Sequence, residues 1–432
     1  MIQNYKLMNP KILFLVLFFP SLIYCQWVTL NSGISQNLNF VYFLNTQTGF
    51  ACGAAGVIIR TVNAGQNWTV VGSSTGNELK SIHFVNTSTG LVCGYNGTIL
   101  RTSNGGTIWA PVSSGSSNHL FGISFFNDMI GISAGNSGTM LYTINGGLNW
   151  SVGQPEGFLV TFYSAFMVSQ TIGYIAGVNT IFSPLFGKTT NGGANWTFSS
   201  FYLNNNEGTL RDIYFFDVQN GIAVSNVWDG RGAISRTANG GVNWTSQIFT
   251  NAIYGIDFPT ALTGYTIGFS GSILKSTDGG NSWAQQTSGT SAFLKAVDFI
   301  DSVNGFAAGD GGVILKTTNG GIVGFKQINN QIPKDFYLGQ NYPNPFNPAT
   351  KIQFSVPPLE GAGGRIISIT IYDVLGKVIQ TLVNEELQPG TYEVDFDGTN
   401  FPSGVYYYTL TARQAGSSTG DFIQTKKMVL IK

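Results

Sequence analysis

One eight-residue motif recurs along the first three quarters of the chain and constrains the fold more than any other feature. Its template is Thr, any residue, Asn, two glycines, two variable residues and Trp. The six copies that end in Trp occupy residues 61–68, 102–109, 143–150, 189–196, 237–244 and 276–283. A seventh copy, at 317–324, ends in Gly324. A fixed period of about 40 residues indicates that one structural unit is stacked repeatedly.

Each unit has the pattern of four short strands. A first alternating run ends in Phe, a second run follows a Gly, a third ends in Arg or Lys, and a fourth begins at Trp. Four antiparallel strands in a unit of about 40 residues are typical of a β-propeller blade. The seven units therefore predict an all-β chain with a seven-bladed β-propeller at residues 26–324.

The two ends of this repeat array complement each other. Trp27 precedes Trp68 by 41 residues, the same step that separates Trp68 from Trp109, yet no third-strand sequence precedes Trp27. The last unit has a third strand but carries Gly324 at the Trp position. We therefore predict that residues 27–30 supply the outer strand of the seventh blade and close the ring, which removes exposed sheet edges.

Composition excludes several classes of function. The chain holds 21 basic and 21 acidic residues, so nothing attracts it electrostatically to nucleic acid. Two histidines and three cysteines leave little material for a metal site or a Cys/His nucleophile. We expect no catalytic residues, no metal, no cofactor and no nucleic-acid partner, and we expect a monomer.

The recurring motif resembles the Asp-box, or BNR, repeat of sialidase-type propellers. Ser276, Asp278, Gly280, Ser282 and Trp283 form the fullest match. The whole propeller resembles the photosystem II stability and assembly factor family. The motif's Asn or Asp is expected to accept backbone N–H groups in a tight turn, which is a structural role.

Two further repeat positions carry polar side chains. The position on the inner strand is predicted to line the central channel; it holds Tyr42, His83, Ser124, Ala165, Tyr214, Asp257 and Asp298. The position at the end of the third strand is predicted to pack through long aliphatic stems; it holds Arg60, Arg101, Tyr142, Lys188, Arg236, Lys275 and Lys316.

The N-terminal residues 1–25 are predicted to be a signal peptide. Lys6 and Lys11 precede an apolar run at 12–24, which is too short to cross a bilayer. Cleavage is expected after Cys25, and lipidation of Cys25 is the alternative. No later segment is long and apolar enough to span a membrane, so the mature chain is expected to be secreted or held at the outer-membrane cell surface.

The last hundred residues differ in pattern from the repeats. A polar linker is predicted at 325–335, and proline-punctuated alternating runs at 336–432 predict a small Ig-like β-sandwich. From the residues alone it could be a plain adhesion-like domain. It resembles the type A C-terminal sorting domain of the type IX secretion system.

That resemblance implies that the secretion machinery is a partner of this chain. It also implies which residues carry recognition. These are Asn344, Pro345 and Phe346 in the opening motif, Asp373 and Gly376 in the central turn, Gly404 and Tyr406 in the following strand, and Lys426, Lys427 and Met428 in the terminal signal.

Three insertions interrupt the repeat in its fourth and fifth units. They fall at 178–187, 201–208 and 225–232. In an antiparallel blade, the loop between the second and third strands and the link to the next blade emerge on one face, so the insertions are predicted to cluster there. The candidate ligand-binding residues on them are Phe186, Tyr202, Glu207, Trp228, Asp229 and Arg231. Neutral drift of the insertions is the alternative.

These observations favour a secreted, non-enzymatic binding module whose ligand is a protein or a glycan. The alternative is an extracellular carbohydrate-active hydrolase of the sialidase-like Asp-box type. Its candidate carboxylates are Glu156, Glu207, Asp229 and Asp310. The arginine-containing motif expected of sialidases is absent from the sequence, which argues against this alternative.

Overall fold

The computed structural model describes residues 27–153, 160–318, 320–321, 325–329, 331–358, 365–387, 389–398, 401–414 and 422–432. The predicted signal peptide, with Cys25, lies outside these residues, as do Glu156 and Gly324.

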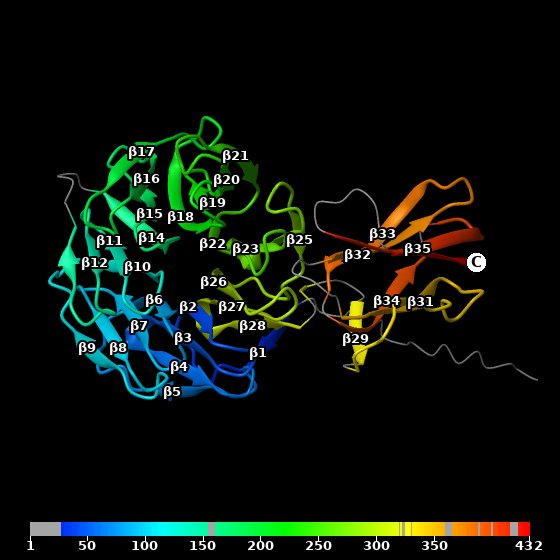
Figure 1. Cartoon of the computed structure of the whole chain (residues 1–432), viewed down its shortest axis with the longest axis horizontal. Helices are drawn as coiled ribbons and strands as arrows, with labels where there is room; N and C mark the ends of the chain where they lie inside the picture. The colour runs from blue at the N-terminus through cyan, green and yellow to red at the C-terminus, as the bar shows by residue number, and fades with distance from the viewer. Residues whose placement is uncertain are drawn as a thin grey trace, which may run out of the picture.

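Seven four-stranded antiparallel sheets are found in the described part of the propeller, and Figure 1 shows them arranged around a ring. The inner strands are β2 (Leu38–Phe43), β6 (Leu79–Phe84), β10 (Leu120–Phe125), β14 (Thr161–Met167), β18 (Gly208–Phe215), β22 (Ile253–Asp257) and β26 (Leu294–Phe299). The second strands are β3 (Gly49–Gly53), β7 (Gly90–Gly94), β11 (Gly131–Gly135), β15 (Gly173–Val178), β19 (Gly221–Val227), β23 (Gly264–Gly268) and β27 (Gly305–Gly309). Neighbouring inner strands contact one another around the ring, and β26 returns to β2.

The outer half of each sheet is equally regular. The third strands are β4 (Ile58–Thr61), β8 (Ile99–Thr102), β12 (Met140–Thr143), β16 (Pro184–Thr189), β20 (Gly232–Thr237), β24 (Ile273–Ser276) and β28 (Ile314–Thr317). The outer strands are β5 (Thr69–Val71), β9 (Ala110–Val112), β13 (Ser151–Val152), β17 (Thr197–Ser200), β21 (Thr245–Phe249), β25 (Ala284–Gln286) and β1 (Val28–Leu30). Short 3₁₀ turns are η1 (Ala54–Gly56), η2 (Phe269–Gly271) and η3 (Asp310–Gly312). We number the sheets as blades one to seven by their inner strands.

The N-terminal strand closes the ring, as predicted. β1 pairs with β28 in antiparallel register, with Val28 opposite Lys316 and Leu30 opposite Ile314. Trp27 is fully buried, and its indole Nε1 donates a hydrogen bond of 2.9 Å to Gln286 Oε1 in blade six. The first and last parts of the propeller therefore share one sheet, and the tryptophan ties that sheet to the preceding blade.

A Phe–Gly pair explains the start of the second strand in most blades. The aromatic ring that ends the inner strand covers the backbone of the glycine opposite. In blade one, a Cβ at Gly49 would lie 2.5 Å from the ring of Phe43. Phe43 in turn stacks on Phe306 of blade seven, with 3.6 Å between ring centroids. The glycine thus lets the ring lie flat in the contact between blades.

The Asp-box residues have the local role predicted for them. In blade one, Thr61 Oγ1 accepts the Gly65 N–H at 3.0 Å, and Asn63 Oδ1 accepts the Asn67 N–H at 3.0 Å. In blade six, Ser276 and Asp278 repeat this geometry. The recurrence of Asn at the Asp position is explained because both side chains supply the same acceptor oxygen.

The cationic position at the end of the third strand also packs as predicted. Four of the cations, Arg60, Lys188, Lys275 and Lys316, lie over aromatic rings of their own blades; the Lys316 Nζ lies 5.4 Å from the centroid of Phe306, and the Lys188 Nζ 5.6 Å from that of Tyr174. Several also reach the next blade, since the Lys316 Nζ donates to the Ala64 carbonyl oxygen at 3.0 Å. These side chains join neighbouring blades and do not converge on one anion site.

The C-terminal region is a sandwich of two four-stranded sheets with the orders β29-β34-β31-β30 and β33-β32-β35-β36. Its strands are β29 (Phe325–Asn329), β30 (Tyr337–Leu338), β31 (Ala349–Val356), β32 (Arg365–Tyr372), β33 (Val378–Glu386), β34 (Gly390–Asp397), β35 (Gly404–Gln414) and β36 (Phe422–Leu430). The predicted Ig-like sandwich is confirmed. The first five residues of the predicted linker form β29, an edge strand paired with β34, so this part of the linker prediction was wrong.

Removal of the Trp27 side chain tests the closure. We expect Trp27→Ala to lower the free energy of unfolding by about 3–5 kcal/mol, because it leaves a cavity at a fully buried site and breaks the bond to Gln286. The next residue, Val28, is 56% exposed, so Val28→Ala serves as the control and is expected to change little. Urea unfolding monitored by circular dichroism measures both. Equal effects of the two substitutions would contradict the closure role.

Candidate functional site

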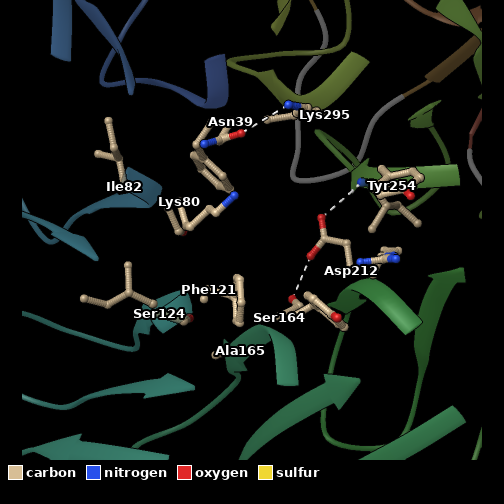
Figure 2. A pocket seen from close by; sticks show the side chains of 18 of the residues that line it. Asn39, Lys80, Ile82, Phe121, Ser124, Ser164, Ala165, Asp212, Tyr254 and Lys295 are labelled. Carbon is tan, nitrogen blue, oxygen red and sulfur yellow. Dashed lines mark hydrogen bonds between the residues drawn. The ribbon is translucent and has the colours of Figure 1, made fainter. Parts of the chain in front are cut away.

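The inner strands of all seven blades enclose a cavity of about 540 Å³ along the axis of the ring. Figure 2 shows that Asn39, Lys80, Phe121, Asp212 and Lys295 approach it from five different inner strands. A cavity of this size is in the range that ligand sites occupy.

A β-bulge occurs at the same place in each of the seven inner strands. The ladder register shifts by one residue near the start of the strand, which leaves one residue unpaired. The seven unpaired residues, which we call the bulge ring, are Asn39, Lys80, Phe121, Tyr163, Arg211, Tyr254 and Lys295. Bulges redirect side chains, and all seven of these residues line the cavity.

The bulge ring lies on the same face as the insertions. In blade five, Gly208 at the start of the inner strand pairs with Val227 at the end of the second strand. The bulge at Arg211 therefore lies close to the loop that follows Val227. The other six blades have the same strand order. The bulge ring therefore surrounds the mouth of the channel on the face where second strands connect to third strands.

The bulge ring combines cations with aromatic rings. The Cζ atom of Arg211 lies 4.4 Å from the ring centroid of Tyr163 and 4.8 Å from that of Tyr254. The Lys80 Nζ lies 4.7 Å from the ring centroid of Tyr95 and forms an ion pair of 2.6 Å with Glu78. The ring itself contains no carboxylate, and its cationic and aromatic groups can contact aromatic and anionic groups of a ligand.

The Lys295 side chain shows the same arrangement. Its Nζ lies 5.4 Å from the ring centroid of Phe293 and 2.5 Å from Asp310 Oδ1. Asp310, which is a candidate carboxylate of the hydrolase alternative, thus forms an ion pair with Lys295.

Deeper in the channel, the inner-strand position described above lines the wall, as predicted. Its side chains also join consecutive blades. Asp298 Oδ2 accepts the Phe43 N–H at 2.6 Å, Asp257 Oδ2 accepts the Phe299 N–H at 2.7 Å, and the Tyr214 hydroxyl donates to the Phe258 carbonyl oxygen at 3.0 Å. This position therefore reinforces the ring from inside.

Burial shifts the pKa values of several side chains that line the cavity. It raises the pKa of Asp257 to about 7 and that of Asp212 to about 6, and it raises the pKa of Asp298 well above its usual value. Burial also lowers the pKa of His83 to about 4, so its imidazole is neutral at pH 7. His83 stacks against Phe125 of the next blade, with 5.7 Å between ring centroids.

The three insertions meet at one place, as predicted. The rings of Phe182 and Trp228 pack edge to face with 4.8 Å between centroids, and the Trp228 Nε1 donates to the Phe182 carbonyl oxygen at 3.4 Å. The Trp228 N–H donates to the Glu207 carbonyl oxygen at 3.4 Å. Tyr202 and Trp228 are 61% and 57% exposed. The insertions thus form an aromatic rim on the channel-mouth face.

Two charged residues of the rim, Arg231 and Asp229, are paired with each other. Arg231 contacts Asp229 at 2.6 Å, and its Nη2 also donates to Asn206 Oδ1 at 3.1 Å. The hydrogen bonds from Arg231 lower the pKa of Asp229. Glu207 is exposed.

Phe186 does not belong to this rim, contrary to the prediction. It lies on β16 and is 2% exposed, packed between Tyr174 and Trp244. Its ring also lies against the backbone of Gly241, where a Cβ would be 2.0 Å away. Phe186 was included because the predicted insertion extended into β16, which begins at Pro184; the exposed aromatic residue of this insertion is Phe182, which was not predicted.

The bulge ring was also missed. Its seven members share one repeat position, so aligning the repeats would have grouped them. Nothing in the sequence marks the register shift that turns these side chains into the channel.

The residues of the sorting motif surround the C-terminal strand β36. Asn344 Oδ1 accepts the Val429 N–H at 3.0 Å, and the buried Phe346 bridges to Leu430. Pro345 lies between them in this segment. Met428 is fully buried, whereas Lys427 is exposed.

The remaining motif residues support turns and strand ends. Asp373 Oδ1 accepts the Leu375 and Lys377 N–H groups in the turn that contains Gly376, whose φ is 80°. The Tyr406 hydroxyl donates to the Pro402 carbonyl oxygen at 2.8 Å, close to Gly404 at the start of β35. The Lys426 Nζ lies 5.9 Å from the ring centroid of Tyr337.

Comparisons with known proteins agree with both parts of this architecture. A family model described as photosynthesis system II assembly factor YCF48 matches residues 61–153 and 248–340. A model described as secretion system C-terminal sorting domain matches residues 340–425. The chain therefore combines a propeller of Asp-box repeats with a secretion sorting domain, and both predicted resemblances are confirmed.

Solved structures support the fold of the propeller. YCF48 from Cyanidioschyzon merolae is 18% identical, with a TM-score of 0.56 over 67% of this chain and 98% of that one. YCF48 bound to D1 peptide is 19% identical, with a TM-score of 0.56 over 69% and 99%. The WD40 propeller domain of Doa1 is 15% identical, with a TM-score of 0.54 over 67% and 94%. No curated protein matches the chain significantly.

The sorting domain indicates a protein that the type IX secretion system exports to the cell surface or beyond. Among the described residues, no helix has the length and apolarity needed to cross a bilayer.

The raised pKa of Asp257 predicts how stability depends on pH. The folded chain binds this proton more tightly than the unfolded chain, whose Asp titrates near pH 4, so stability falls as pH rises from about 4 to about 7. Asp257→Asn keeps an acceptor oxygen but cannot ionise, so we expect it to reduce the fall in melting temperature between about pH 5 and pH 8.

The matched control for this prediction is Asp217→Asn. Asp217 is exposed, and hydrogen bonds lower its pKa, so its substitution is expected to leave the slope over this pH range unchanged. Differential scanning fluorimetry measures all three slopes. The interpretation fails if Asp257→Asn has the same slope as the natural chain.

Proposed function

We propose that this protein is an extracellular, non-enzymatic propeller that binds a peptide segment of another protein on its channel-mouth face. The observation that carries this proposal is the bulge ring, which places cations and aromatic rings around an open cavity. The exposed rings of Tyr202 and Trp228 extend the same face. Tyr, Trp and Arg are the residues that most often dominate protein interfaces.

A peptide ligand is favoured over a glycan by two considerations. YCF48, a propeller of similar fold, has been solved bound to a D1 peptide. In addition, three carboxylates at the mouth and rim are engaged in ion pairs, Glu78 with Lys80, Asp310 with Lys295 and Asp229 with Arg231. They are less free to bind sugar hydroxyls than unpaired carboxylates are.

The hydrolase alternative lacks a suitable pair of carboxylates in the described residues. A general acid for glycoside hydrolysis needs a raised pKa, whereas the pKa of Asp229 is lowered by its hydrogen bonds with Arg231. The carboxyls with raised pKa, Asp212, Asp257 and Asp298, each accept a backbone N–H group of the next blade. These hydrogen bonds join neighbouring blades of the propeller.

We further propose that the predicted signal peptide and the sorting domain act in sequence during export. The side of β36 that carries Lys427 is open to solvent, and the segment with Asn344 and Phe346 holds the end of that strand in place. The secretion machinery would then recognise a C-terminal strand whose position is set by the opening motif.

A double substitution on the rim tests the binding face. Peptides selected from a phage-displayed library on the mature chain are expected to bind Tyr202→Ala/Trp228→Ala at least about tenfold more weakly, because two large exposed contact surfaces are lost. Phe126→Ala is the matched control. Phe126 is 44% exposed but follows an inner strand directly, so it lies on the opposite face.

Isothermal titration calorimetry of the selected peptides measures these affinities, and a glycan array with a reducing-sugar assay is run in parallel. Binding of glycans alone, or release of sugar, would overturn the proposed function. Unchanged peptide affinity in the double variant would remove the rim from the site.

A further inference from the structure

Arg211 differs from the other cations of the bulge ring in how it is held. It lies on β18, and the two rings that flank its guanidinium belong to Tyr163 on β14 and Tyr254 on β22, the inner strands on either side. All three side chains are half-buried and line the cavity. We call this arrangement the arginine clasp.

One edge of the guanidinium is anchored and the other is open. The Arg211 Nε donates a hydrogen bond of 2.7 Å to Asn226 Oδ1. Within the described residues, the two Nη nitrogens have no hydrogen-bond or ion-pair partner. By contrast, Lys80 and Lys295 each contact a carboxylate. Arg211 is therefore the cation of the ring whose charge is left for a ligand.

The neighbouring carboxyl group does not neutralise Arg211. Asp212 follows it in the sequence, but its Oδ1 accepts the Ser164 hydroxyl at 2.7 Å and the Ile213 N–H at 2.9 Å, while its Oδ2 accepts the Ile256 N–H at 3.2 Å. Figure 2 shows Asp212 directed toward Ser164. The bulge separates the two side chains, so the carboxyl holds the blades together and the guanidinium reaches the channel mouth.

We propose that the arginine clasp binds a carboxylate group of the peptide ligand, an inference that rests on the proposed function. A guanidinium offers two parallel N–H donors that match the two oxygens of a carboxylate. The tyrosine rings limit the rotation of the guanidinium, which reduces the entropy lost on binding. The carboxylate belongs either to the chain end or to an acidic side chain.

The experiment uses an array of random hexapeptides on which the full mature chain is bound. Each sequence is synthesised with a free C-terminal carboxylate and with a C-terminal amide, and each is repeated with Asp and Glu replaced by Asn and Gln. We expect the forms without any carboxylate to bind about tenfold or more weakly than forms with one. If replacing the C-terminal carboxylate by an amide reduces binding, the clasp binds the chain end. If replacing Asp and Glu reduces binding, the clasp binds an acidic side chain.

Variants of the clasp test the residue assignment. Arg211→Gln is expected to reduce binding of the carboxylate-bearing peptides to the level of the carboxylate-free forms. Arg211→Lys keeps the charge but lacks the planar fork, so an intermediate affinity is expected. Tyr163→Phe keeps the ring and is expected to retain binding. Arg236→Gln is the matched control. Arg236 is a cation on β20 that contacts Asn281 at the side of the propeller, so its substitution is expected to leave the affinity for peptides unchanged.

Melting temperatures and near-ultraviolet circular dichroism confirm that each variant is folded before its affinity is compared. If peptides bind with equal strength whether or not they carry a carboxylate, the face binds peptides but the clasp proposal is wrong. The same follows if Arg211→Gln is folded and binds as the natural chain does. If no peptide form binds at all, the proposed function itself fails.

Discussion

The pairing of β1 with β28 is the interaction on which the rest of the propeller depends. It joins residues separated by almost the whole repeat array, and it places the fully buried Trp27 against the preceding blade. A ring closed in this way leaves each inner strand between two neighbours. Only then can Asp298 in the last blade reach the backbone of Phe43 in the first. The shape of the channel is a consequence of closure.

The antiparallel order within each blade links the two parts of the candidate site. The start of an inner strand and the loop after the second strand lie at the same end of the sheet, so the bulge ring and the insertions share one face. A site assembled on a rigid ring can present both an exposed aromatic rim and an oriented guanidinium.

Much of the fold was predictable because it is written in short-range patterns. The repeat period, the Gly-rich turns and the displaced Trp27 indicated four-stranded blades and their closure. The Asp-box turn is local, so its hydrogen bonds at Asn63 followed from residue type alone. The site was predicted only in part. Trp228 and Tyr202 are exposed on the insertions that carry them, whereas Phe186 was assigned to the same surface although its ring is in the core.

The sequence by itself thus determined the repeated sheet and the face on which the insertions emerge, because each depends on local spacing, whereas the sorting domain was identified by its resemblance to a known family. The tertiary structure alone decided the direction of side chains at the channel mouth. A strand's side chains alternate with a period of two, so a one-residue bulge reverses their orientation. That shift turns Arg211 toward the channel mouth and leaves Asp212 bound to the next blade's backbone. Residues 325–329 likewise became strand β29 only because β34 offered an unpaired edge.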